Sequence, residues 1–151
     1  MHTWLLHENN GQRTFAVVLA TGEEVMASLG HFARRERIAA AQITAVGALR
    51  EAVLCYFDWE KKGYSQIPVR EQVEVASFLG DIAEAPSGEP ALHVHIVLGR
   101  RDGSALAGHL GEAHVRPTLE VLITETPAHL RRVKDPESGL ALIKLARGES
   151  I

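Results

Sequence analysis

The chain has 151 residues, a length typical of one domain, and a chain of this size buries about two-thirds of the surface that its unfolded form exposes. Hydrophobic residues make up 46% and charged residues 23% of the sequence, which indicates neither a disordered nor a fibrous protein. The formal net charge of -3 argues against a dominant nucleic-acid-binding surface, because affinity for nucleic acids rests largely on Lys and Arg side chains. We expect a single domain over residues 1–151.

No apolar run in the sequence is long enough to cross a bilayer, and the first residues, MHTWLLHENNG, have neither a basic start nor a cleavable apolar core. We therefore expect a cytoplasmic protein. Cys55 is the one cysteine in the chain, so an internal disulfide is excluded. Its position in the apolar run AVLCYF predicts a small core residue without a chemical role.

The N-terminal part of the chain predicts two strands and a helix. Residues 3–7 and 14–20 are short apolar, β-branched segments separated by an Asn-Asn-Gly turn signal. Thr21, followed three residues later by Glu24, forms the pattern of a capping box. Apolar residues then recur at helical spacing, which predicts one amphipathic helix over residues 22–36.

The middle of the chain has the period of a β-sheet, with short polar or glycine-bearing turns between the strands. The clearest turn is WEKKG at residues 59–63, and the Pro/Gly/Ser-rich segment at 84–90 predicts a loop. The predicted strands are 43–49, 52–58, 64–69 and 73–79.

Residues 91–110, ALHVHIVLGRRDGSALAGHL, contain three histidines around a turn signal. His93 and His95 are two residues apart in an alternating apolar run, and this separation in a strand places both side chains on one face, about 6.6 Å apart. A three-residue turn over residues 101–103 would pair Arg100 with Ser104 and place His95 opposite His109. In that register His95 lies between the other two histidines.

The length of the turn decides the interpretation. A two-residue turn at Asp102 and Gly103 would shift the pairing by one residue and turn His109 to the other face. With the three-residue turn, three neutral imidazoles form a site for a transition metal, zinc first, with a fourth position left for water or a ligand. The alternative is a set of half-buried strand histidines without a metal.

Beyond the histidines, residues 116–124 predict a strand on which Glu120 lies on the face of polar residues. If that face adjoins the histidines, Glu120 is a candidate general acid or base or a group that orients a metal ligand; otherwise it is a solvent-exposed carboxylate. The sequence then predicts a loop or short helical turn at 127–134, a turn at 135–139 and a final strand at 140–145.

Several segments occur together in the order and spacing of a known family, and they cover nearly the whole chain. The segments are AVVLATGEEVMASLGHFA, AVGALREAVLCYFD, VEVASFLGDI, LHVHIVLGRRDGSALAGHL and VRPTLEVLIT. On these segments the chain resembles the PPC domain family, the domain shared by plants and prokaryotes.

The resemblance implies an α+β fold in which a bent, mainly antiparallel β-sheet packs against one principal α-helix. It also implies a homotrimer in which His93, His95 and His109 bind a metal, usually zinc, near a subunit interface. Fold and histidine pattern are similar to those of acetolactate decarboxylase, a zinc lyase, which leaves a metal-dependent lyase-like activity as an open alternative.

Prokaryotic members of this family carry the label of predicted DNA-binding proteins, inherited from plant relatives that join the domain to AT-hooks. An AT-hook needs an Arg-Gly-Arg-Pro core, and the one Arg-Pro pair here, Arg116-Pro117, lacks the preceding Arg-Gly. The leading hypothesis is therefore a small metal-binding homotrimer that binds or acts on a small polar metabolite. The alternative is a DNA-binding regulatory protein.

Overall fold

A seven-stranded antiparallel sheet, a separate two-stranded hairpin and one helix make up the computed structural model, which describes residues 1–145. Residues 146–151, which the expected domain includes, lie outside the described part. The elements in chain order are β1 (His2–Asn9), β2 (Gln12–Ala20), α1 (Val25–Glu36), β3 (Ala40–Asp58), β4 (Gly63–Val69), β5 (Val73–Glu84), β6 (Pro90–Gly99), β7 (Ala105–Glu125), β8 (Arg132–Lys134) and β9 (Ala141–Ile143).

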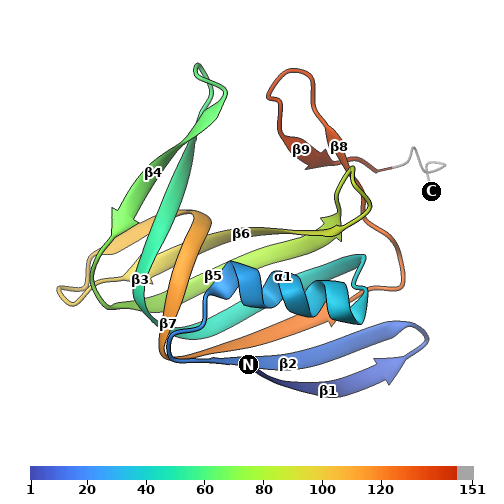
Figure 1. Ribbon diagram of the computed structural model, residues 1–151, viewed down its shortest axis with the longest axis horizontal. Helices are drawn as coiled ribbons and strands as arrows, with labels where there is room; N and C mark the ends of the chain where they lie inside the picture. The colour runs from blue at the N-terminus through green and yellow to red at the C-terminus, as the bar shows by residue number, and fades with distance from the viewer. Residues whose placement is uncertain (146–151) are drawn as a thin grey trace.

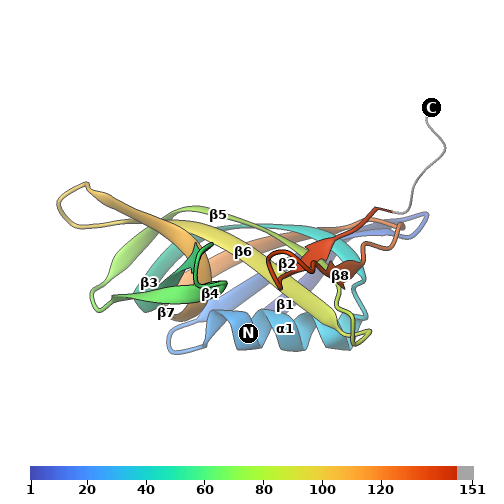
Figure 2. The same ribbon diagram turned by 90° about the horizontal axis from the view of Figure 1, so that it is seen from above.

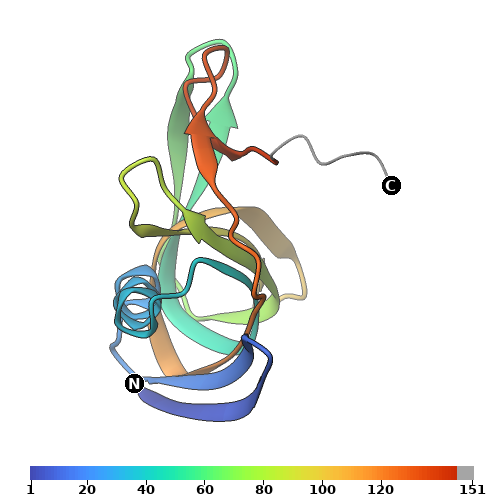
Figure 3. The same ribbon diagram turned by 90° about the vertical axis from the view of Figure 1, so that its right-hand side faces the viewer.

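The sheet is strongly curled because β7 pairs with more than one neighbour. Its first residues pair with β6, its middle and end pair with β3, and its last part also pairs with β2. Since β3 pairs with β5 and β5 with β6, strands β3, β5, β6 and β7 close into a ring, along which Figure 3 looks. The expected bent, mainly antiparallel sheet with one principal helix is confirmed.

Two strands are longer than the sequence predicts. The separate strands expected at 43–49 and 52–58 are one strand, β3, and the strand expected at 116–124 is the end of β7. The β3–β7 ladder contains register shifts, among them one between Gly47 and Leu49. Such irregularities bend a strand without ending it. The break between the two expected strands, at residues 50–51, therefore marks a bend in one strand and not a turn.

The helix begins later than predicted, and its cap is a different residue. The N-cap is Glu24, whose carboxylate accepts hydrogen bonds from the backbone N–H groups of Met26 and Ala27. The predicted cap, Thr21, instead donates its hydroxyl hydrogen to the carbonyl of Pro117. Gly22, with φ of +90°, turns the chain between β2 and α1, which moves the helix start beyond Thr21.

The C-terminal segment ends in a small hairpin. Residues 127–130 form part of the loop expected at 127–134, whereas Arg132–Lys134 is a strand, and the strand expected at 140–145 is Ala141–Ile143. Arg132–Lys134 pairs with Ala141–Ile143, and the predicted turn between them is confirmed by a 2.8 Å hydrogen bond from the Gly139 N–H to the Asp135 carbonyl. Figure 1 shows this hairpin and the β3–β4 arm projecting from the same side of the molecule.

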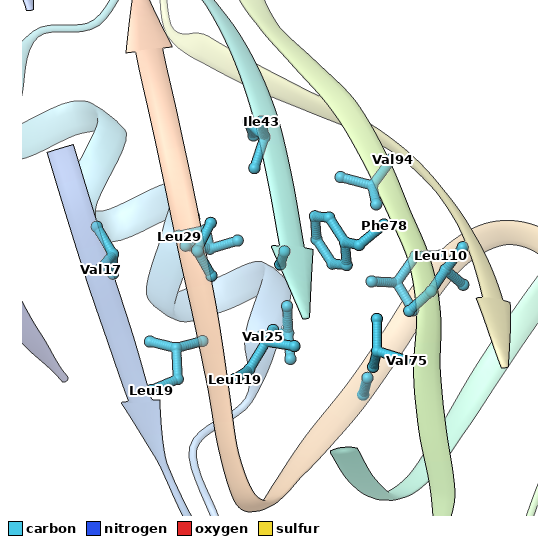
Figure 4. Packing of buried hydrophobic residues seen from close by; sticks show 14 of the residues in the cluster. Val17, Leu19, Val25, Leu29, Ile43, Val75, Phe78, Val94, Leu110 and Leu119 are labelled. Carbon is cyan, nitrogen blue, oxygen red and sulfur yellow. The ribbon is translucent and has the colours of Figure 1, made fainter. Parts of the chain in front are cut away.

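The hydrophobic core lies between α1 and the concave side of the sheet, where α1 packs against β6 and β7. Figure 2 shows α1 alongside the sheet, and Figure 4 shows how Val25 and Leu29 of the helix approach strand residues such as Leu119 and Phe78. All four of these side chains are almost fully buried. This packing fixes β6 and β7, the two strands that carry the histidines. No helix within residues 1–145 is long and apolar enough to cross a membrane.

Candidate metal centre

The β6–β7 turn has three residues, which decides the register of the histidines. The backbone N–H of Arg100 donates to the carbonyl of Ser104 over 2.8 Å, and Gly103 has φ of +83°. Asp102 stabilises the turn by accepting hydrogen bonds from the N–H and the hydroxyl of Ser104. His95 consequently pairs with His109, as predicted.

Three imidazoles meet on the outer side of the curled sheet. The ring centroids of His93, His95 and His109 lie 5.1, 5.3 and 5.6 Å apart, and each ring offers a nitrogen within 4.8 Å of the others. This triangle is nearly equilateral. The expectation that His95 lies between the other two is therefore wrong, because the ring of His93 lies about as close to that of His109 as to that of His95.

The electrostatics of the site favour neutral imidazoles. Burial lowers the pKa of His93. The positive charge of Arg132 and the neighbouring His95 lower this pKa further, whereas the carboxylate of Asp81 raises it. Burial also lowers the pKa of His109, with the two other histidines acting in the same direction. Neutral imidazole is the form that binds a metal ion.

The residues fit a bound transition metal. Nδ1 of His109 is buried and has no hydrogen-bond partner. Buried polar atoms are normally paired, and a metal ion would provide the partner that this nitrogen lacks. Zinc–nitrogen bonds of about 2.0–2.1 Å in a tetrahedral site put ligand nitrogens about 3.4 Å apart. Small side-chain rotations would bring the nitrogens, now within 4.8 Å, to this spacing. In the described residues this is the one such group of His, Cys, Asp or Glu side chains.

A cavity of about 490 Å³ opens beside the three histidines. The β3–β4 arm supplies aromatic walls, and the ring of Tyr64 lies 5.0 Å from that of His109. Leu140, from the turn of the β8–β9 hairpin, lines another side. Cys55 is buried, as the sequence predicts, but it also lines this cavity.

Two charged residues that the sequence does not predict as part of the site lie against it. Asp81 of β5 is opposite His93 in the β5–β6 ladder, and its Oδ2 lies 3.7 Å from the Nδ1 of His93. Arg132 of β8 forms an ion pair with the same carboxylate. If the 84–90 loop joins two paired strands, counting back from it places Asp81 opposite His93. No pattern in the sequence points to Arg132.

The structure does not bring Glu120 to the histidines. Its carboxylate is exposed, and the residue lies opposite Val18 on one side and Val46 on the other. The part of β7 that carries Glu120 is separated from β6 by two strands, β3 and β5. At ordinary strand spacing this corresponds to about 14 Å between β7 and β6. A role for Glu120 as a general acid or base stays a prediction.

The comparisons with known proteins agree with this arrangement. The model of the Plants and Prokaryotes Conserved (PCC, also written PPC) domain matches residues 6–127, which contain α1 and all three histidines. The chain belongs to the PCC domain family. A search of curated proteins gives no match.

Solved structures of similar proteins cover most of this PCC-domain chain. A metal-containing protein from Archaeoglobus fulgidus is 32% identical, with a TM-score of 0.80, and the match covers 87% of this chain and 93% of that one. A PPC protein from Pyrococcus horikoshii is also 32% identical, with a TM-score of 0.82 and coverage of 89% and 93%. A candidate DNA-binding protein from Bacteroides thetaiotaomicron is 28% identical, with a TM-score of 0.82 and coverage of 91% and 94%.

A more distant likeness concerns the fold alone. A Staphylococcus aureus protein of unknown function, described as similar to α-acetolactate decarboxylase, matches with a TM-score of 0.55 and 12% identity. The match covers 74% of this chain and 51% of that one. The PCC-domain fold is thus weakly similar to that of an acetolactate decarboxylase-like protein, as the sequence predicts.

Proposed function

We propose that this protein is a small homotrimer that binds one divalent transition metal per subunit through His93, His95 and His109. The observation that carries the proposal is the meeting of three imidazole nitrogens within 4.8 Å of one another. A site with three protein ligands leaves a coordination position open, as in catalytic zinc sites. The archaeal relative described as metal-containing supports the presence of a metal.

Zinc is the metal that we propose first. Imidazole suits zinc, copper, iron and nickel, and three imidazoles with no thiolate or carboxylate ligand are a known zinc donor set. The lowered pKa values of His93 and His109 support binding near neutral pH, because protons compete less for these nitrogens.

The ligand that we propose is a small polar metabolite. The cavity of about 490 Å³ beside the histidines has room for such a molecule, and the metal would supply an electrophile that attracts an oxygen of the ligand. Tyr64 and Leu140 would hold its less polar part. If the protein also acts on this metabolite, the reaction that we propose is a metal-dependent, lyase-like one.

An exposed apolar face supports the homotrimer. Directly opposed residues share one face of a sheet. One row of opposed residues on this face is Leu79, Thr44 and Leu122, and a second row is Val46, Glu120 and Val18. Of these, Leu79, Leu122, Val46 and Val18 are between 37% and 61% exposed in the single chain. Leu79 also pairs with His95, so subunits that cover this face would approach the metal centre.

Two measurements on purified protein test the proposal. Elemental analysis is expected to find about one zinc or other divalent transition metal per subunit, and light scattering is expected to give three times the chain mass of 16.5 kDa. Protein that holds no metal after growth in metal-supplemented medium would contradict the metal site. A monomer would contradict the assembly.

DNA binding is the second candidate, favoured by the description of the Bacteroides relative. The net charge of -3 and the missing AT-hook core argue against it. Gel shifts with AT-rich duplexes at two salt concentrations distinguish the candidates, because non-specific binding disappears as salt increases. The proposal includes a cytoplasmic location, which cell fractionation tests.

A further inference from the structure

The β8–β9 hairpin reaches the metal centre from outside the family domain. The family model ends at residue 127, whereas the hairpin spans Arg132 to Ile143. Leu140 from its turn lines the cavity beside the histidines. The segment before the hairpin is anchored to the end of β5, where the N–H of Glu84 donates to the Leu130 carbonyl over 2.8 Å.

Arg132 is the charged anchor of this hairpin. Its side chain is 8% exposed, and it forms an ion pair with Asp81 and donates a hydrogen bond of 3.2 Å to the carbonyl of Ala141. A buried guanidinium is stable only when paired, so the docked position of the hairpin depends on the Asp81 carboxylate. The two residues are 51 positions apart in the chain.

The same carboxylate faces a histidine. One oxygen of Asp81, Oδ1, accepts from Arg132, and the other, Oδ2, lies 3.7 Å from Nδ1 of His93. A carboxylate that accepts the second ring N–H of a histidine ligand fixes the tautomer and the orientation of the ring. A proton on Nδ1 directed at Asp81 would leave the free electron pair of His93 on Nε2.

We propose that Asp81 and Arg132 are positioning residues of the metal centre. Asp81 keeps the Nδ1–H of His93 directed away from the metal so that Nε2 binds it, and Arg132 holds the carboxylate in place. The C-terminal hairpin thereby tunes metal affinity without providing a ligand. This inference rests on the proposed metal site, and its test separates the two.

The test measures zinc affinity by competition with a chromogenic chelator in the full-length protein. Asp81→Ala is expected to weaken zinc binding by about 10- to 100-fold, the usual effect of removing such a partner. Asp81→Asn retains an acceptor oxygen, so it should restore part of the affinity. Arg132→Met should weaken binding less than Asp81→Ala, and the double variant should be no weaker than Asp81→Ala because both residues act through one carboxylate.

Arg131→Met is the matched control. Arg131 is the neighbouring arginine of the same segment, and its side chain, 68% exposed, pairs with Glu84 over 3.3 Å without touching Asp81. This variant is expected to bind zinc as the wild type does. An equal loss in Arg131→Met and Arg132→Met would overturn the proposal, since any loosening of the hairpin would then have the same effect.

Two spectroscopic readouts separate positioning from folding. In the metal-free protein, ¹⁵N chemical shifts of His93 should report Nδ1–H in the wild type and a tautomer mixture in Asp81→Ala. The visible spectrum of the Co²⁺-loaded protein should change in Asp81→Ala and be nearly restored in Asp81→Asn. Wild-type affinity in both Asp81 variants would overturn the positioning role and leave the metal site standing; a wild type that binds no metal would overturn both.

Discussion

His95 lies directly opposite His109 in the β6–β7 ladder, and this pairing depends on a turn of three residues. Side chains alternate between the faces of a strand, so a shift of one residue would carry His109 to the opposite face. The metal centre therefore depends on which residues pair across a turn that contains none of its ligands.

Deletion of Ala105, between the turn and His109, is expected to abolish metal binding. Arg100 would still pair with Ser104 across the three-residue turn, so Leu110 would move opposite His95 and His109 would turn to the other face of the sheet. This separates His109 from His93 and His95, which leaves two ligands on one strand. Elemental analysis after growth with zinc measures the loss.

Gly103→Ala is the control for this deletion. It strains the turn, because Gly103 has φ of +83°, but it removes no residue and so keeps the strand register, and a Cβ at this position meets no atom within 4 Å. We expect a loss of about 1–2 kcal/mol in the free energy of unfolding with the metal content retained. Loss of metal in Gly103→Ala together with retention in the deletion variant would contradict the role of register.

Replacing any one of the three histidines by Ala is expected to weaken zinc binding by a similar factor. The nearly equilateral arrangement of the rings gives no ligand a central position. The fold should persist, because a core of this size does not depend on a metal. Chelator competition beside thermal melts measures both quantities; equal zinc affinity in all three variants and the wild type would contradict the site.

The sequence predicts the histidine cluster but not the residues around it. The cluster follows from local patterns, namely strand alternation at His93 and His95 and a turn signal that is close in the chain. Arg132 reaches Asp81 through tertiary packing of a hairpin far along the chain, which no local pattern encodes. The capping pattern at Thr21 fails for a similar reason, because the Thr21 hydroxyl finds a partner in the distant Pro117.

Lowering the pH is expected to destabilise the metal-free protein. The pKa values of His93 and His109 are lower in the folded state than the ordinary 6.5, so the unfolded chain binds protons first as the pH falls. The unfolded state thus binds more protons just below that value, and stability decreases there as the pH decreases. Urea unfolding from about pH 7.5 to about pH 5 measures this, and the double variant His93→Gln/His109→Gln should show a flatter dependence.

Gly80→Ala is expected to destabilise the protein and disturb the site. A Cβ at Gly80 would lie 2.6 Å from the backbone oxygen of His93, so β5 and β6 would have to separate where the first ligand is held. We expect a loss of about 1–3 kcal/mol, typical of overpacking, together with weaker zinc binding. Gly63→Ala is the control, since its Cβ would meet only the Lys61 oxygen at 3.8 Å. Chemical denaturation and chelator competition compare the two variants.

Leu122→Lys is expected to convert the proposed trimer to monomers. Leu122 is 49% exposed in the single chain and lies on the apolar face with Val46 and Leu79, where a charge would have to be buried in the assembly. Leu5→Lys is the matched control: Leu5 is 44% exposed, but it pairs with Phe15, whose side chain points into the core, and so lies on the other face of the sheet. Light scattering should give the 16.5 kDa chain mass for Leu122→Lys and three times that mass for Leu5→Lys. A trimer that survives in Leu122→Lys and is lost in Leu5→Lys would place the subunit contact on the opposite side of β1 and β2.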